Sequence, residues 1–139
     1  MSDSGSTPTP AVALMDRAAT LISAIGAVDH VAGETSMTVA FEGTRAAVQS
    51  MTLSEGLDVL SVTQVLAWDL PNTDALRDDI ERLSGQMSFG AIKRASTEVT
   101  TDVLAHYTFP AGTLDDAALL TMVHLVLSTG TELSAALTA

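Results

Sequence analysis

Apolar residues recur at helical spacing near the beginning of the chain. They stand three or four positions apart between Leu14 and Ile25, which predicts a helix over about residues 10–26. Thr9 followed by Pro10 is typical of a helix start, because a threonine oxygen can accept a backbone hydrogen bond and proline lacks an N–H that would stay unpaired. The chain therefore opens with a helix that buries one face.

A second helical pattern follows an apolar run that ends at Pro71. Asn72 or Thr73 can cap this helix through a side-chain oxygen, and Gly85 is expected to close it. Its apolar residues again lie three or four positions apart and form one stripe. This helix should cover part of a sheet.

The last helix is expected to begin after Thr113 as its N-cap and to run to about residue 135. Its segment 117–127 is apolar almost all round, and a helix with two apolar faces needs two partners. One partner is the sheet, and the second could be another subunit. The residues of this helix that we predict as possible partner or dimer contacts are Leu120, His124 and Leu127.

Between the helices the apolar pattern has a period of two, as in strands with one buried face. Glu42 and Gly43 supply a tight turn between the first two strands, and the third strand is apolar on both faces. The expected strands cover residues 35–42, 44–53, 57–70, 88–96 and 102–109.

These elements predict an α+β fold with the order helix, three strands, helix, two strands, helix (αβββαββα). An antiparallel sheet should pack against the helices. Residues 1–9 are Ser, Thr, Pro, Gly and Asp without apolar periodicity beyond the initial Met, so we expect a flexible N-terminal tail. Residues 10–139 are expected to form a single domain.

The charge of the chain narrows the classes of partner. Seventeen acidic residues against six basic ones give a formal net charge of -11, which disfavours nucleic acid and anionic lipid. The N-terminus lacks the features of a signal peptide, and the apolar run at 117–127 is about half of the roughly 20 residues that span a bilayer. With no cysteine in the chain, we expect a cytoplasmic protein without a membrane segment.

No motif points to a reaction, a cofactor or a metal ion. His30, His106 and His124 are far apart in the sequence and share no ligand spacing. There is no GxSxG motif, no phosphate-binding glycine loop and no cysteine nucleophile. The acidic pairs stand on helices at adjacent positions, which point about 100° apart and do not converge. We therefore predict no catalytic, cofactor-binding or metal-binding residues.

Trp68, near the end of the two-faced strand, is the best single candidate for a partner contact. Tryptophan is enriched among the residues that contribute most to protein interfaces. The alternative is a tryptophan in the core or on a sheet face covered by a helix, and the apolar surroundings favour that alternative.

Three passages resemble the YbjN family, a group of bacterial proteins with the α/β fold of type III secretion chaperones. The passages are "VTQVLAWDLP", "LRDDIERLSGQMSFGAIKRAS" and "DVLAHYTFPAGTLDDAALLTMVHLVLSTG", and the resemblance covers about residues 10–137. The chain departs from the family at Ser84-Gly85-Gln86, where family members often have an asparagine-containing stretch.

The resemblance implies a non-enzymatic homodimer that handles other proteins, as a chaperone-like binder of extended segments or as a regulator in a stress or signalling pathway. Its partner would be a protein client. A small-ligand-binding or enzymatic α+β domain is the alternative, and a deep pocket that collects His106, Asp102 and an arginine would favour it.

Overall fold

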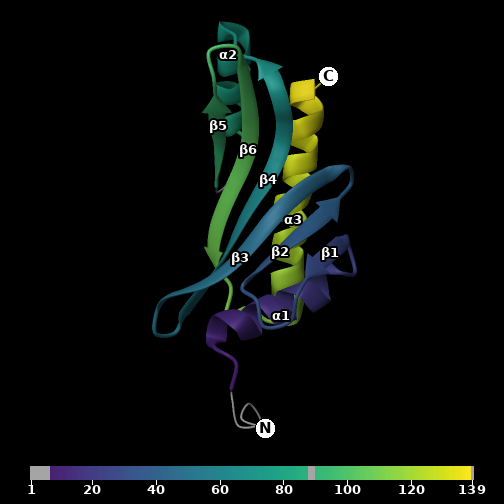
Figure 1. Cartoon of the computed structure of the whole chain (residues 1–139), viewed down its shortest axis with the longest axis vertical. Helices are drawn as coiled ribbons and strands as arrows, with labels where there is room; N and C mark the ends of the chain where they lie inside the picture. The colour runs from purple at the N-terminus through teal and green to yellow at the C-terminus, as the bar shows by residue number, and fades with distance from the viewer. Residues whose placement is uncertain (1–6, 88–89, 139) are drawn as a thin grey trace.

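The computed structural model describes residues 7–87 and 90–138 of the chain (Figure 1). Within these residues the fold is mixed α+β with three helices and an antiparallel sheet, as the sequence predicted, and the sheet has six strands where five were expected. The elements are α1 (Pro10–Ile22), β1 (Ala27–His30), β2 (Ser36–Phe41), β3 (Thr44–Ser54), β4 (Leu57–Pro71), α2 (Asp74–Ser84), β5 (Ala91–Ser96), β6 (Thr100–Pro110) and α3 (Asp116–Thr138).

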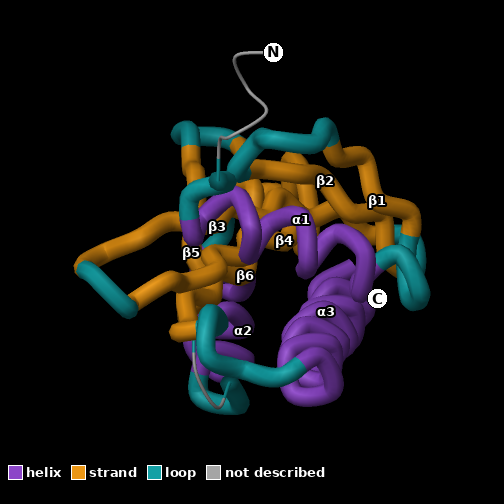
Figure 2. Tube along the Cα trace, turned by 90° about the horizontal axis from the view of Figure 1, so that it is seen from below, coloured by secondary structure: helices purple, strands orange, loops and turns teal. Residues whose placement is uncertain are grey.

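The sheet is open and has the strand order β1-β2-β3-β4-β6-β5. Seen from below, α1, α2 and α3 all lie on one side of it (Figure 2). The opposite face of the sheet, which we call the outer face, is turned toward the viewer in Figure 1 and carries no described helix. The helices and the sheet thus form two layers, and the core lies between them.

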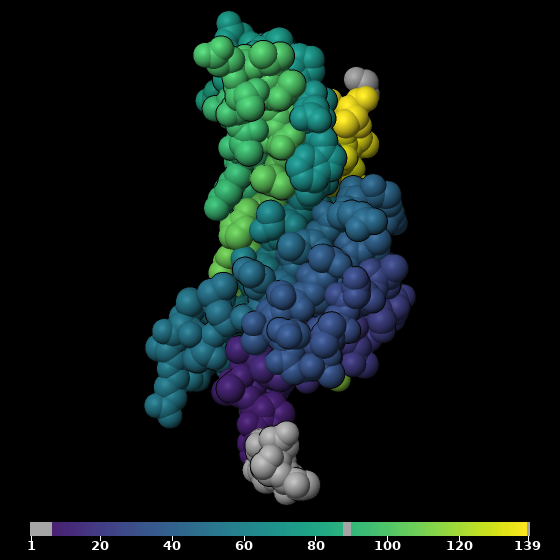
Figure 3. All heavy atoms as spheres, viewed as in Figure 1, coloured from purple at the N-terminus to yellow at the C-terminus, as the bar shows by residue number. Residues whose placement is uncertain are grey.

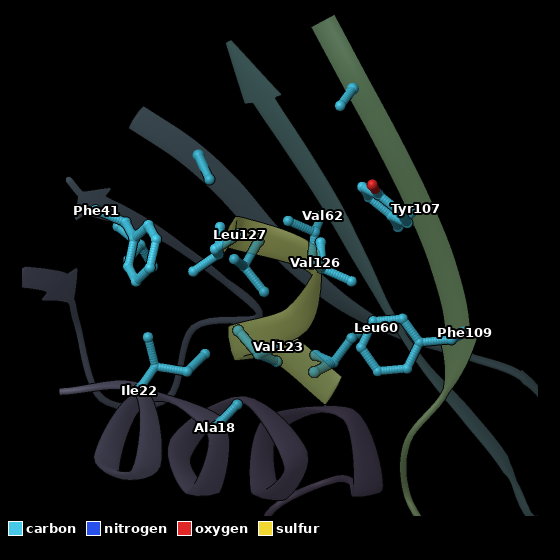
Figure 4. Packing of buried hydrophobic residues seen from close by; sticks show 14 of the residues in the cluster. Ala18, Ile22, Phe41, Leu60, Val62, Tyr107, Phe109, Val123, Val126 and Leu127 are labelled. Carbon is cyan, nitrogen blue, oxygen red and sulfur yellow. The ribbon is translucent and has the colours of Figure 1, made fainter. Parts of the chain in front are cut away.

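The core is aliphatic with a few aromatic rings. Ala18 and Ile22 of α1 meet Val123 of α3 beneath the sheet, and Leu60 and Phe109 reach down from adjacent strands (Figure 4). The strand alternation follows the prediction in the last strand, where the buried residues are Thr101, Val103, Ala105, Tyr107 and Phe109.

The expected order was wrong in one element, because four strands and not three stand between α1 and α2. Helix α1 ends at Ile22, and β1 then pairs with β2. Gly26 is not a helix terminus: a Cβ there would lie 2.8 Å from the Ala40 carbonyl oxygen, so glycine permits close approach of two strands. His30 belongs to β1, and its Nε2 lies 2.8 Å from Asp16 Oδ1.

Two of the three expected helix caps are confirmed. Thr9 Oγ1 accepts a hydrogen bond from the Val12 amide at 3.2 Å, and Thr73 likewise caps α2. The expected cap of α3 at Thr113 is wrong, because Asp115 Oδ1 accepts from the Ala118 amide at 2.7 Å. An aspartate in this position also suits the positive end of the helix dipole.

Helix α3 is held against β4 by a contact between Gln64 and Gly130. The Gln64 side chain is fully buried, and its Nε2 donates to Thr44 Oγ1 at 2.8 Å and to the Leu127 carbonyl oxygen at 3.2 Å. A Cβ on Gly130 would lie only 1.8 Å from Gln64 Oε1. The absence of a side chain at this helix position therefore allows the buried amide and the helix to fit together.

The predicted N-terminal tail lies largely outside the described residues, since residues 1–6 are not among them. Residues 7–9 are exposed and precede α1.

Candidate functional site

Trp68 lies on the surface and not in the core, contrary to the interpretation that the sequence favoured. Its side chain is 63% exposed. The pairing of β4 with β6 shifts register between Val65 and Ala67 and again between Ala67 and Leu70, so the regular inward and outward alternation is lost here. Both Leu66 and Ala67 are buried, and Trp68 is turned out.

The backbone after Trp68 is held in a bulge. Asp69 has a φ of 53°, a left-handed conformation that aspartate tolerates better than most residues. Its backbone N–H donates to Asp102 Oδ1 on β6 at 2.8 Å. The side chain of Asp102 is therefore engaged in keeping the irregular end of β4 against β6.

Among the described residues, residues 65–71 of β4 have no strand partner on the side away from β6, and we call this segment the free edge. The pairing of β4 with β3 ends at Gln64, whereas its pairing with β6 continues to Pro71. Ser134 Oγ of α3 donates to the Leu66 carbonyl oxygen at 2.6 Å, and this bond satisfies one backbone group of the irregular segment. In Figure 1 the upper part of β4 runs beyond the end of β3, which turns away from it.

A hollow of about 250 Å³ lies at this edge. We call it the Trp68 notch. In Figure 3 the surface is indented between the lobe of β2 and β3 and the upper end of β4. Its lining residues come from the turn before β3 and the start of β3, from β4, and from the last part of α3: Gly43, Thr44, Arg45, Val65, Leu66, Ala67, Trp68 and Ser134.

Of the described residues that line the Trp68 notch, Arg45 is the one with a charged side chain. It is exposed, and among the described residues no ion pair or side-chain hydrogen bond engages its guanidinium. No sequence pattern singles it out, since an exposed arginine near the start of a hairpin strand is ordinary. Its relevance arises only because β3 diverges from β4 at this point.

The three predicted contacts on α3 do not form one surface with Trp68. Leu127 is fully buried in the core, so a partner cannot reach it in the folded chain. Leu120 is half-buried, and the exposed ring of His124 stands edge-on to buried Phe41 with centroids 5.9 Å apart. The notch meets α3 at Ser134, ten residues beyond His124 and thus about 15 Å further along the helix.

A second apolar surface, which the sequence analysis missed, is the tip of the β3–β4 hairpin. We call residues 51–57 the arm. It projects beyond the body of the molecule in Figure 1, and its apolar residues Met51, Leu53 and Leu57 are exposed, Leu53 to 59%. The buried and exposed alternation of β3 stops at Ser50, and every later residue of the strand is exposed. All residues of the arm are exposed, so no other part of the described chain buries either face.

The outer face of the sheet carries a row of polar side chains around His106. Its Nδ1 lies 2.9 Å from Thr63 Oγ1, and its Nε2 lies 3.3 Å from Thr108 Oγ1. Burial lowers the pKa of His106 below 6.5, and the positive charge of Lys93 lowers it further. A neutral ring protonated on Nε2 satisfies both contacts. A hydroxyl that contacts an imidazole, as Thr63 does here, is one part of an activated nucleophile. The group on the other ring nitrogen is the Thr108 hydroxyl and not the carboxylate that would orient the imidazole in such a site.

The sequence analysis expected a deep pocket around His106 and Asp102 if the chain were a ligand-binding or enzymatic domain. Neither residue lines any of four hollows found among the described residues. The largest of these four, about 390 Å³, lies at the outer face of β1 to β3, and its charged residues Asp29 and Glu34 are both acidic. Among residues 7–87 and 90–138, no group of three or more His, Asp or Glu residues could hold a metal ion.

Comparison with known protein families and with curated proteins found no match to this chain. Helix α3 is long and apolar enough to cross a membrane by length and composition, because it extends well past the apolar run at 117–127. One third of the most apolar window of α3 is buried inside the fold, and core helices meet the same criterion.

Proposed function

We propose that the chain is a non-enzymatic protein-interaction module that binds an extended segment of a protein partner at the Trp68 notch and acts as a homodimer. The observation that carries the proposal is the free edge of β4 at residues 65–71, which stands beside an exposed tryptophan and a hollow. The resemblance to the YbjN family and to type III secretion chaperones implies the same kind of role.

Strand addition is the physical reason for this choice. A free strand edge offers backbone N–H and C=O groups that an extended segment can satisfy, while adjacent side chains supply specificity. Trp68 adds a large contact area with few rotatable bonds, and such residues dominate binding energy when a partner covers them. The two register shifts in β4 interrupt the edge, so the added segment would be short.

The arm supports the homodimer. A two-stranded ribbon without packing on either face is marginal in water, and the arm exposes three large apolar side chains. A second copy of the chain offers the same surface in return, as two-fold symmetry requires. Sedimentation at tens of micromolar tests this part, and a monomer there would contradict it.

Peptide selection tests the binding function. A library of random peptides, displayed with both internal and terminal segments accessible, is selected on the full chain and on two variants, Trp68→Ala and Val99→Ala. Val99 is the matched control, because it is 74% exposed in the turn between β5 and β6. The proposal predicts peptides that bind the wild type and the Val99 variant and lose affinity for the Trp68 variant. Binding that ignores Trp68, or no enriched peptide, contradicts it.

A further inference from the structure

The charge inside the Trp68 notch is opposite to the charge of the whole chain. The net charge is -11, and three of the cations, Arg17, Arg77 and Arg82, are engaged by nearby aspartates. Arg45 is not engaged by any carboxylate of the described residues, and it lines the notch. A guanidinium offers a planar fork of donors that matches a carboxylate. The positive charge of Arg45 therefore favours a ligand with an anionic group at the notch, although the protein as a whole is acidic.

The two hydroxyl groups that line the notch already have hydrogen-bond partners. Ser134 donates its hydroxyl hydrogen to the Leu66 carbonyl oxygen. The Thr44 hydroxyl donates to the Phe41 carbonyl oxygen and accepts from Gln64. Arg45 is thus the charged side chain in the notch with donors left for a ligand, and the indole N–H of exposed Trp68 is a neutral donor. The walls formed by Val65, Leu66, Ala67 and the Trp68 ring are otherwise apolar.

The size of the notch indicates which part of a partner would enter it. Pockets for drug-sized ligands are about 300–1,000 Å³, and this hollow of about 250 Å³ is smaller. It suits the last one or two residues of a chain better than a continuous segment, because the bulge at residues 65–70 interrupts strand pairing. A chain terminus also brings a single negative charge, whereas an acidic segment would be repelled by the net charge of -11.

We propose that the Trp68 notch binds the C-terminal residue of a protein partner, with its carboxylate on the Arg45 guanidinium and its apolar side chain against Trp68. The terminal backbone then lies along the free edge of β4. This inference rests on the proposed binding function and specifies which part of the partner is recognised.

Pairs of peptides that differ only at the C-terminus test the inference. Five acetylated pentapeptides, Gly-Ser-Gly-Val followed by Leu, Ile, Val, Met or Phe, are prepared as free acids and as amides. Binding is followed by the emission of Trp68, which is the only tryptophan in the chain and should shift to shorter wavelength when covered. Fluorescence anisotropy of N-terminally labelled versions gives the dissociation constants independently.

The variants are Arg45→Gln and, as the matched control, Arg94→Gln. Arg94 is also exposed and without an ion pair among the described residues, and it lies on β5 at the far edge of the sheet. Both variants change the net charge equally, so a general electrostatic effect would alter both. Each variant is first checked for an unchanged circular dichroism spectrum and urea midpoint.

The expected result is that the free acids bind about 10–100-fold more tightly than the amides to the wild type and to the Arg94 variant. In the Arg45 variant the ratio should fall to about 1. Equal binding of acids and amides to the wild type, or a ratio that survives Arg45→Gln, overturns the inference. If acids and amides bind equally and both depend on Trp68, the proposed function stands without the terminal carboxylate. If neither kind of peptide binds, the inference is wrong, and selection on internal segments decides the proposed function.

Discussion

The contact between Gln64 and Gly130 predicts a large cost for a single added methyl group. In Gly130→Ala the new Cβ would lie 1.8 Å from Gln64 Oε1, 2.4 Å from its Cδ and 2.9 Å from its Nε2. These atoms cannot stay in place. Gln64 is fully buried, so its amide has no free space to enter, and Gly130 lies in the helix that forms one wall of the Trp68 notch.

The magnitude follows from three contributions. Overpacking of a well-filled core costs about 1–3 kcal/mol. Displacing the amide also weakens its hydrogen bonds to Thr44 and to the Leu127 carbonyl oxygen, each with a net value of about 0.5–1.5 kcal/mol. Alanine returns about 1 kcal/mol through its higher helix propensity. The free energy of unfolding should therefore fall by about 1–5 kcal/mol.

Urea unfolding followed by circular dichroism measures this change. The matched control is Gly85→Ala, where the backbone is right-handed with a φ of -66° and the nearest atom to a new Cβ is 3.5 Å away. That variant should be unchanged or more stable by up to about 1 kcal/mol. In a Gln64→Ala background the obstacle is gone, and Gly130→Ala should become neutral or stabilising. Equal costs in the two backgrounds, or a wild-type midpoint for Gly130→Ala alone, would refute the reasoning.

Three further predictions concern the surface. Trp68→Ala should lower the free energy of unfolding by less than about 2 kcal/mol, against about 3–5 for a core tryptophan, and a larger loss in urea would contradict its exposure. Folding lowers the pKa of His106 through burial and Lys93, so the stabilisation from this group is complete above pH 6.5 and is lost as the pH falls below that value. His106→Gln should flatten the pH dependence of the urea midpoint there, and an unaltered slope would show that another group causes it. Leu53→Asp should shift sedimentation toward the monomer while Val99→Asp does not, and an equal effect of both would exclude a specific role of the arm.

Much of the fold could be predicted because the apolar pattern in the chain is regular. The alternation in β6 identified its buried residues, and Glu42 and Gly43, both with positive φ, form the tight turn that joins β2 and β3. Strand β1 was not predicted, because its four residues, Ala27–His30, do not alternate between apolar and polar side chains. The type III secretion chaperone-like fold stays a prediction.

The candidate site could be predicted only in part. The sequence identified Trp68 as a possible partner contact but favoured a buried position for it. A β-bulge changes which side chains face the core, and the apolar pattern of the sequence does not show where such a bulge lies. Leu127 was expected to face a partner, but the helix presents it to the sheet beside Val126. Arg45 joins the notch through the divergence of β3 from β4, which is a property of the whole sheet and not of the local residues.

Whether the Trp68 notch binds a segment of a protein partner is decided by the ratio of two dissociation constants, that of the Trp68 variant and that of the wild type. The dissociation constant of a selected peptide is measured for the wild type, for Trp68→Ala and for Val99→Ala by fluorescence anisotropy. Trp68→Ala should weaken binding about 30-fold or more, as for a residue at the centre of an interface, and Val99→Ala should leave it unchanged. If the Trp68 variant binds within about twofold of the wild type, the notch is not the binding site.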